Sequence, residues 1–299
     1  MTSPNICIPI DTLTLCNGLV IDIARLDRIH PTLSGNKWFK LMPNVSSLAP
    51  GATIASFGGA HSNHIHALAY ACSQLNVSSV GVIRGEPQLT PTLIDAKEWG
   101  MRLYFVDRQS YRDKRFSKEG SDEWCWLPEG GSNALAVKGC AHILSSMAKG
   151  VESFDRIYTA VGSGATLAGL IYSAPLDKTV IGISALGGVA DLKDRVASLL
   201  AELPEKKLPQ WHISHGSELR YGKINAALAS LWTRASQLGL DLDPIYTLRV
   251  LERILLDYRS GHLSGQRVLM LHTGGLQGIR AQQDRISRLA SNFIGPQPL

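Results

Sequence analysis

Four short runs contain the side chains of this chain that could carry out chemistry. They are Ser34-Gly35-Asn36-Lys37, Ser56-Phe57-Gly58-Gly59-Ala60-His61-Ser62-Asn63, Gly162-Ser163-Gly164-Ala165-Thr166 and His272-Thr273-Gly274-Gly275. Together the runs supply a lysine amine, several hydroxyl groups and a glycine-rich loop of the kind that holds a phosphate group. Each run alone is a weak signal, so its meaning depends on the elements that position it.

Lys37 is the amine of the first run. It follows Gly35-Asn36 and precedes an apolar helical pattern, Trp38-Phe39-Lys40-Leu41-Met42. It should therefore lie near a helix start, where the positive end of the helix dipole favours a neutral amine. A neutral amine can bond to a carbonyl carbon, whereas most lysines at helix ends are only solvated cations. The neighbouring runs favour the first interpretation.

The run at residues 162–166, here called the phosphate loop, follows an expected strand at 156–161 and opens an expected helix at 165–173. Backbone N–H groups at such a helix start bind phosphate when glycine exposes them. A dinucleotide-binding turn would need a glycine in place of Leu167 and an acid near 183–187, and the sequence has neither. The Gly-Lys-Ser/Thr of a P-loop is also absent. The loop therefore predicts a phosphate site and disfavours a nicotinamide dinucleotide.

Ser62 and Asn63 fall where an expected strand at 53–57 gives way to an expected helix at 64–75. Ser and Asn are the preferred residues for capping a helix, and a helix N-terminus also attracts anions. Capping and ligand binding can therefore coexist at this position. The preceding Gly58-Gly59 lets the backbone come close to a ligand.

Three histidines near this loop, His61, His64 and His66, could suggest a metal site. On a regular helix, residues three apart share a face, but residues five apart do not. The three imidazoles could not converge on one ion, so we predict no metal site. The nucleophile elbow of hydrolases is also excluded, because it needs glycine two positions before and two positions after Ser62.

Alternating strand and helix patterns position these runs. Strands are expected at 53–57, 79–84, 102–106, 156–161, 180–185 and 266–272, and helices at 64–75, 92–99, 165–173, 192–201 and 224–238. The alternation predicts an α/β fold with mostly parallel sheets, in which ligands bind beyond the carboxyl ends of the strands. The charged, irregular segment 109–126 suggests a crossing between a small inserted domain, 42–125, and a large domain formed by 1–41 plus 126–299.

The composition narrows the class of protein. Of 299 residues, 44% are hydrophobic and 18% charged, with a net charge of +5, so a large core can form. The basic residues are scattered, which argues against a nucleic-acid partner. Five cysteines without a Cys-x-x-Cys motif suggest free thiols in a reducing compartment. Neither a signal peptide nor an apolar stretch of membrane-spanning length is evident, so we expect a cytoplasmic protein without a membrane partner.

Taken together, the four runs contain the groups needed to hold pyridoxal phosphate as a Schiff base. In order and wording they resemble the family of 1-aminocyclopropane-1-carboxylate deaminase and D-cysteine desulfhydrase. The matching residues are Gly35-Asn36-Lys37 with Lys40-Leu41, Gly58-Gly59 with Ser62-Asn63, Thr166-Leu167-Ala168-Gly169, and His272-Thr273-Gly274-Gly275. The resemblance covers residues from about 30 to 280. It implies two three-layer α/β/α domains of the type II pyridoxal phosphate fold, similar to the tryptophan synthase β subunit, and a homodimer.

The resemblance also implies roles for individual residues. Lys37, rather than Lys40, would form the Schiff base, Asn63 would contact the phenolic oxygen of the cofactor, and Thr273 would contact its ring nitrogen. The phosphate loop would hold the phosphate group through Gly162, Ser163, Gly164, Ala165 and Thr166. The catalytic residues would be Lys37, Ser62, Tyr221 and Tyr246, and the substrate would be bound by Ser62, His64 and Gly59.

The sequence around Tyr246 bears on the substrate. The deaminase branch reads Asp-Pro-x-Tyr-Glu, whereas this chain reads Asp243-Pro244-Ile245-Tyr246-Thr247 and lacks the acid, as the desulfhydrase branch does. A neutral Thr273 at the ring nitrogen would also favour prompt loss of a β-leaving group. We therefore expect α,β-elimination from D-cysteine, which gives pyruvate, ammonia and sulfide. The alternative is ring opening of 1-aminocyclopropane-1-carboxylate to 2-oxobutanoate and ammonia.

Two alternatives come from other classes of protein. A nicotinamide oxidoreductase would use the phosphate loop differently, although Leu167 and the missing acid disfavour it. A non-catalytic protein that binds pyridoxal phosphate would keep Lys37 and the phosphate loop. The departures from the family pattern at His61, His66 and Leu248 keep that second alternative open.

Overall fold

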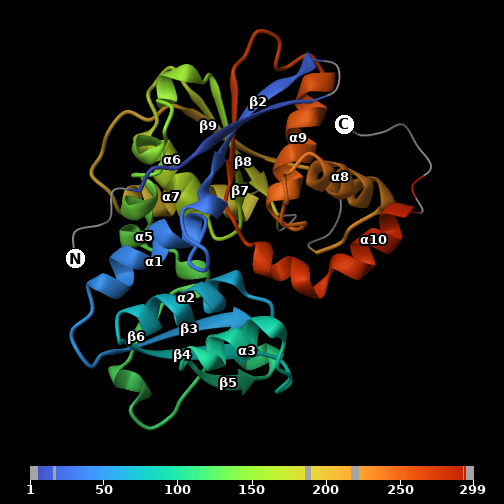
Figure 1. Ribbon diagram of the computed structural model, residues 1–299. Helices are drawn as coiled ribbons and strands as arrows, with labels where there is room; N and C mark the ends of the chain where they lie inside the picture. The colour runs from blue at the N-terminus through green and yellow to red at the C-terminus, as the bar shows by residue number, and fades with distance from the viewer. Residues whose placement is uncertain (1–5, 16–17, 186–189, 217–221, 292, 294–299) are drawn as a thin grey trace.

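Two mostly parallel β-sheets, each flanked by helices, form the computed structural model (Figure 1). It describes residues 6–15, 18–185, 190–216, 222–291 and 293. The six-stranded sheet has the order β1-β2-β10-β7-β8-β9. Its strands are β1 (Ile10–Thr14), β2 (Val20–Arg25), β7 (Arg156–Val161), β8 (Thr179–Ser184), β9 (Gln210–His215) and β10 (Val268–His272). β1 runs antiparallel to β2, and the other pairs are parallel.

Helices cover both faces of the six-stranded sheet because its strands alternate their apolar side chains. Leu269 and Leu271 of β10 face one core, and Val268 and Met270 face the other. The first core is completed by α5 (Ala134–Cys140), α6 (Ala165–Ser173) and α7 (Ala190–Ala201). The second core is completed by α8 (Ala226–Gln237), α9 (Thr247–Arg259) and α10 (Gln283–Ser291).

The four-stranded sheet is parallel throughout and has the order β5-β4-β3-β6. Its strands are β3 (Thr53–Gly59), β4 (Ser78–Arg84), β5 (Arg102–Val106) and β6 (Cys125–Leu127). One face is covered by α1 (Asn36–Ser46), α2 (Asn63–Gln74) and α3 (Pro91–Glu98), and the other by α4 (Arg108–Arg112) and aromatic side chains. Short 3₁₀ turns complete the fold at η2 (Leu26–Arg28), η3 (Ser121–Glu123), η4 (Glu129–Gly131), η5 (Leu144–Ser146), η6 (Val151–Ser153) and η7 (Leu276–Ala281).

Every strand and helix expected from the sequence is present, with ends that move by at most two residues. The strands expected at 102–106 and 156–161 and the helix expected at 165–173 match β5, β7 and α6. The sequence did not predict β1, β2, β6, β9, α4, α5, α9 or α10, and α4 and β6 fall largely within the segment 109–126 that was expected to be irregular. The division into domains at 42–125 stays a prediction, and β6 (Cys125–Leu127) lies across its boundary.

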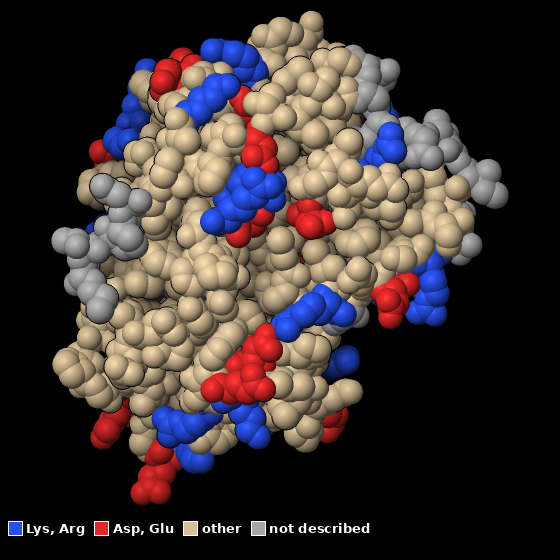
Figure 2. Space-filling model, viewed as in Figure 1, with Lys and Arg blue, Asp and Glu red and all other residues tan. Residues whose placement is uncertain are grey.

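The surface agrees with the scattered charge of the sequence. On the face shown in Figure 2, basic and acidic side chains are interspersed and no broad area carries one sign. Among the described residues, no helix combines the length and the apolar character that crossing a membrane would require.

Candidate active site

Three of the four runs follow the carboxyl ends of strands. The phosphate loop follows β7, the turn at 272–275 closes β10, and Ser62-Asn63 come three residues after β3. The fourth run starts α1, which places Lys37 in the first turn of that helix. Hydrogen bonds from Asn36 join the start of α1 to the turn at 272–275 and to the phosphate loop. The structure therefore brings together residues that are far apart in the sequence, at the sheet edge where ligands bind.

The start of α1 rests directly on the turn at 272–275. The backbone N–H of Asn36 donates to the carbonyl oxygen of Thr273 at 3.2 Å. Gly35 has a φ of +70°, and a Cβ on this residue would collide with the same carbonyl oxygen. Only glycine combines this positive φ with the absence of a Cβ, so Gly35 allows Lys37 to lie next to the turn that carries Thr273.

Asn36 also ties α1 to the phosphate loop. Its Nδ2 donates to Thr166 Oγ1 at 2.8 Å, and its Oδ1 lies 3.5 Å from Lys37 Nζ. Gly164, with a φ of +100°, precedes α6, whose first residue is the buried Ala165. The N–H groups of the first turn of α6 lack partners within the helix. The loop thus has the form of an anion site.

Burial lowers the pKa of Lys37 to about 8, and the nearby Cys140 opposes this shift weakly. The amine is thus partly deprotonated near neutral pH, as a group that bonds to a carbonyl carbon must be. The helix dipole predicted the same direction from the sequence. In the structure, loss of solvation is the larger cause.

Lys40 is a second buried amine in the site, which the sequence analysis did not assign. It is 2% exposed, and its Nζ donates to the carbonyl oxygen of Gly130, to Ser132 Oγ at 3.2 Å and to Ser163 Oγ of the phosphate loop at 3.0 Å. Burial, and then the charge of Lys37, lower its pKa well below the ordinary lysine value. These three oxygens are all uncharged, so a phosphate at the loop would complete the environment of both lysines.

Ser62 and Asn63 lie at the start of α2, as predicted. Ser62 Oγ caps the helix by accepting from the backbone N–H of Ile65 at 3.3 Å. Asn63 Oδ1 accepts from Gln277 Nε2 at 2.5 Å, and Asn63 Nδ2 lies beside Gly275. Asn63 therefore joins α2 to the segment that follows β10. Nothing in the sequence indicated Gln277.

His64 is a buried, neutral imidazole, and its neighbours indicate which ring nitrogen carries the hydrogen. Ser56 Oγ donates to the carbonyl oxygen of Leu127 at 2.9 Å, so it accepts from His64 Nε2 at 2.8 Å. His64 Nδ1 is then an acceptor, and no described residue donates to it. Burial and the charges of Lys37 and Lys40 lower its pKa well below the ordinary value.

His64 and His66, two of the three histidines near this loop, contact different residues. His66 Nε2 lies 2.9 Å from Asp95 Oδ2, and its ring packs edge-on against Trp99 at 4.7 Å. His64 instead contacts Ser56. Within the described residues, no cluster of three or more His, Cys, Asp or Glu side chains could hold a metal ion.

His272 fixes the turn that carries Thr273. Its Nε2 lies 2.6 Å from the carbonyl oxygen of Asp241, and its Nδ1 accepts from the N–H of Gly274 at 3.2 Å. Both ring nitrogens are thus used, in the neutral form that has its hydrogen on Nε2. Burial lowers the pKa of His272, which supports this form. Thr273 itself is buried.

Tyr246 lies against the phosphate loop, since a Cβ on Gly162 would be 3.2 Å from its ring. Its backbone N–H donates to Asp243 Oδ1 at 2.6 Å. Burial raises the pKa of Asp243 to about 7, and the sequence analysis did not assign this carboxyl. Arg249 donates to the carbonyl oxygen of Lys223 at 2.6 Å. Tyr221 lies outside the described residues.

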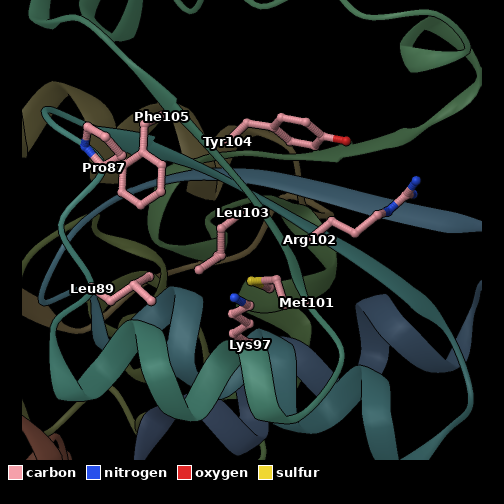
Figure 3. A pocket seen from close by; sticks show the side chains of 8 residues that line it. All are labelled: Pro87, Leu89, Lys97, Met101, Arg102, Leu103, Tyr104 and Phe105. Atoms are coloured by element: carbon pink, nitrogen blue, oxygen red, sulfur yellow. The ribbon is translucent and has the colours of Figure 1, made fainter.

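Gly59 is the last residue of β3, and a Cβ there would approach Arg84. A pocket of about 520 Å³ lies elsewhere, against β5, and its lining includes Lys97, Met101 and Phe105 (Figure 3). None of the predicted site residues line this pocket. The roles predicted for the site residues stay predictions.

Comparison with known proteins finds relatives that match most of this chain. No family model matches the sequence. The chain is 29% identical over 286 residues to a putative 1-aminocyclopropane-1-carboxylate deaminase of Pyrococcus abyssi, covering 88% of this chain and 86% of that one. It is 26% identical over 316 residues to the mitochondrial bifunctional D-cysteine desulfhydrase/1-aminocyclopropane-1-carboxylate deaminase of Arabidopsis thaliana, covering 93% and 78%.

Solved structures support the same fold. A crystal structure of a homologue of 1-aminocyclopropane-1-carboxylate deaminase superimposes with a TM-score of 0.83 at 26% identity, covering 95% of this chain and 94% of that one. A pyridoxal 5'-phosphate-dependent aspartate racemase superimposes with a TM-score of 0.65 at 14% identity, covering 90% of each chain. The second likeness shows the fold alone.

Proposed function

Because this chain resembles 1-aminocyclopropane-1-carboxylate deaminases and D-cysteine desulfhydrases along most of its length, we propose that it catalyses α,β-elimination from D-cysteine followed by hydrolysis with water, which yields pyruvate, ammonia and sulfide. The fold class, the enzyme class and the cofactor predicted from the sequence are confirmed: the chain is a pyridoxal-phosphate-dependent enzyme. Its relatives include both activities, so the choice between them has to come from the site.

The described residues fit the cofactor. When bound, pyridoxal phosphate supplies a carbonyl carbon for an amine and an electron sink beside the α-carbon of the substrate. Lys37 would hold it covalently. The phosphate loop and Lys40 would hold its phosphate group, because they offer N–H donors and a buried amine that has no carboxylate partner and that a phosphate would favour in its charged form. Asn63 and Thr273 would contact the ring.

Lys37 and Ser62 can each perform a step on the substrate. With a pKa of about 8, the Lys37 amine can take up the α-proton of the substrate at Nζ. Ser62 Oγ accepts from Ile65 N as a helix cap, so its own O–H stays available to donate to a substrate carboxylate. Their positions on two different helices, α1 and the start of α2, would hold the substrate from two sides.

The observation that carries the choice of D-cysteine is Thr247. The deaminase branch has glutamate at this position, directly after the tyrosine. Here the side chain is fully buried, and its hydroxyl donates to the carbonyl oxygen of Asp243 at 3.2 Å. A hydroxyl committed to the backbone cannot take the place of an acid beside Tyr246. Elimination from D-cysteine needs no such acid, whereas ring opening would lose its usual proton donor or acceptor.

The test compares the products from two substrates. Protein loaded with pyridoxal phosphate is incubated separately with D-cysteine and with 1-aminocyclopropane-1-carboxylate, and the keto acids and sulfide are measured. We expect equal amounts of pyruvate and sulfide from D-cysteine and little 2-oxobutanoate from the cyclopropane. Formation of 2-oxobutanoate without sulfide would overturn the proposal in favour of the deaminase reaction.

A further inference from the structure

The short helix η7 follows the turn at 272–275, and its side chains contact two helices that cover the four-stranded sheet. It begins directly after Gly275, in the segment that follows β10 and lies against α3 (Figure 1). Gln277 Nε2 donates to Asn63 Oδ1 at 2.5 Å, and Arg280 forms an ion pair with Asp95. Asn63 begins α2 and Asp95 belongs to α3. Two side chains of one short element therefore reach across to the other sheet.

The bond from Gln277 determines which end of the Asn63 carboxamide faces the site. The carbonyl oxygen of Asn63 is taken up by Gln277, while Nδ2 lies beside Gly275, where an added Cβ would be 3.4 Å away. Gly275 has a φ of +92°, so it combines a left-handed backbone with the absence of a side chain. Among the described residues, Asn63 Nδ2 donates to none. Its N–H groups therefore point towards the turn that carries Thr273.

This direction matters because the two ends of a carboxamide have opposite hydrogen-bonding character. The nitrogen can only donate and the oxygen can only accept. An anionic oxygen of a ligand would be bound by the N–H and repelled by the carbonyl. The two ends are nearly equal in size, so shape alone does not select between them. A neighbouring donor that occupies the carbonyl oxygen does.

We propose that Gln277 is a positioning residue that holds the Asn63 carboxamide with its N–H groups towards the bound cofactor. The inference rests on the proposed function, because it takes Asn63 as a contact of pyridoxal phosphate. It goes beyond that function, because it assigns the direction of the contact to a residue 214 positions away in the sequence. The turn that carries Thr273 and the group that would bind the phenolic oxygen are then set by one continuous segment.

A second contact keeps η7 where Gln277 can act. Arg280 and His66 both bond to Asp95 Oδ2, His66 at 2.9 Å. Partial burial acts to raise the pKa of Asp95, but the hydrogen bonds and charges of Arg280 and His66 outweigh it and lower the pKa, so the carboxylate stays charged. The contact of Arg280 with Asp95 joins η7 to α3 about one turn beyond Gln277. It involves His66, which departs from the family pattern.

The test reverses the hydrogen bond without changing the shape of the side chain. Gln277→Glu offers only acceptors, so Asn63 must turn its N–H groups towards residue 277 and its carbonyl towards the cofactor. We expect the dissociation constant for pyridoxal phosphate, titrated by visible absorbance, to rise by about tenfold or more. Gln277→Leu removes the bond without reversing it and should raise the constant by about threefold. Gln283→Glu adds the same charge at an exposed position and should change nothing.

Two further measurements separate positioning from simple structural support. In an Asn63→Ala background, Gln277→Glu should cause no additional loss of affinity, because no carboxamide is left to turn. The thermal midpoints of the cofactor-free Glu and Leu variants should be alike. Equal loss of affinity in the Glu and Leu variants, or a Glu variant that binds as the wild type does, would overturn the proposal. A wild-type protein that binds no pyridoxal phosphate would instead refute the proposed function.

Discussion

Two lysines, one turn apart on α1, have different surroundings in the site. Lys37 lies next to the turn at 272–275, and burial lowers its pKa to about 8. Lys40 is buried more completely and bonds to uncharged oxygens around the phosphate loop. Residues three apart share a helix face, so the sequence contained a signal for the second lysine as well as the first. The family pattern includes both lysines, but it implied a role for Lys37 alone.

Replacement of Lys40 tests this division. Lys40→Met keeps an unbranched side chain that is one atom shorter and removes the amine. We expect the dissociation constant for pyridoxal phosphate to rise by about 10- to 100-fold, because a buried charged hydrogen bond contributes about 1.5–3 kcal/mol. Covalent attachment at Lys37 should persist at saturating cofactor. Loss of all attachment in this variant, with the fold intact by circular dichroism, would contradict the assignment.

Other contacts of the site could not be predicted because they join distant segments through side chains. Ser62 and Asn63 were placed at a helix start by their own capping preference. Gln277 and Asp243 carry no such local signal, because their roles arise only when η7 and the start of α9 meet α2 and the phosphate loop. The pKa of about 7 for Asp243 likewise follows from burial, which a single residue type does not reveal.

At the scale of elements, the sequence predicted the strands that are buried along most of their length, together with the edge strand β5, and missed β1, β2, β6 and β9. The strands β3, β4, β7 and β8 each contain five consecutive buried residues, because both faces of their sheets are covered. The outer strands β1 and β9 alternate with polar residues, and β2 contains Asp22, which bonds to Thr12. The helix α9 does have a regular apolar spacing. It was read only as a departure from the family at Leu248 and Arg249.

The close approach of α1 to the turn at 272–275 predicts that a side chain at Gly35 will destabilise the protein. Gly35→Ala should lower the free energy of unfolding by about 2–4 kcal/mol, because the added Cβ collides with the Thr273 carbonyl in a left-handed conformation. The control is Gly51→Ala. Gly51 has a φ of +81° but no atom within 4 Å of the added Cβ, so the loss should be about 1 kcal/mol.

Urea unfolding measures both variants under the same conditions. The difference between them reports the steric contact together with the backbone strain at Gly35, whose φ of +70° and ψ of −157° lie in a region that is essentially restricted to glycine. Equal losses in the two variants would mean that α1 and the turn are not in the close contact described here. The loss in Gly35→Ala should also be accompanied by weaker binding of pyridoxal phosphate.

At the scale of the whole molecule, two sheets contribute to one site. The six-stranded sheet provides the phosphate loop and the turn at 272–275, and the four-stranded sheet provides Ser62 and Asn63. Hydrogen bonds from Asn36 and Gln277 connect these parts. The position of the site at the carboxyl ends of parallel strands followed from the α/β alternation in the sequence. The domain boundaries at 42–125 and a homodimer stay predictions, because neither follows from the contacts of one chain.

Chemical mapping of the attachment site would show whether Lys37 holds the cofactor of an amino acid lyase. The purified protein is loaded with pyridoxal phosphate, reduced with borohydride so that the attachment becomes permanent, and digested for mass spectrometry. We predict that the modified peptide contains Lys37, with Lys40 unmodified, and that Lys37→Ala loses both the modification and the visible absorbance. Attachment at Lys40 or at another lysine, or a protein that takes up no cofactor, would contradict the account.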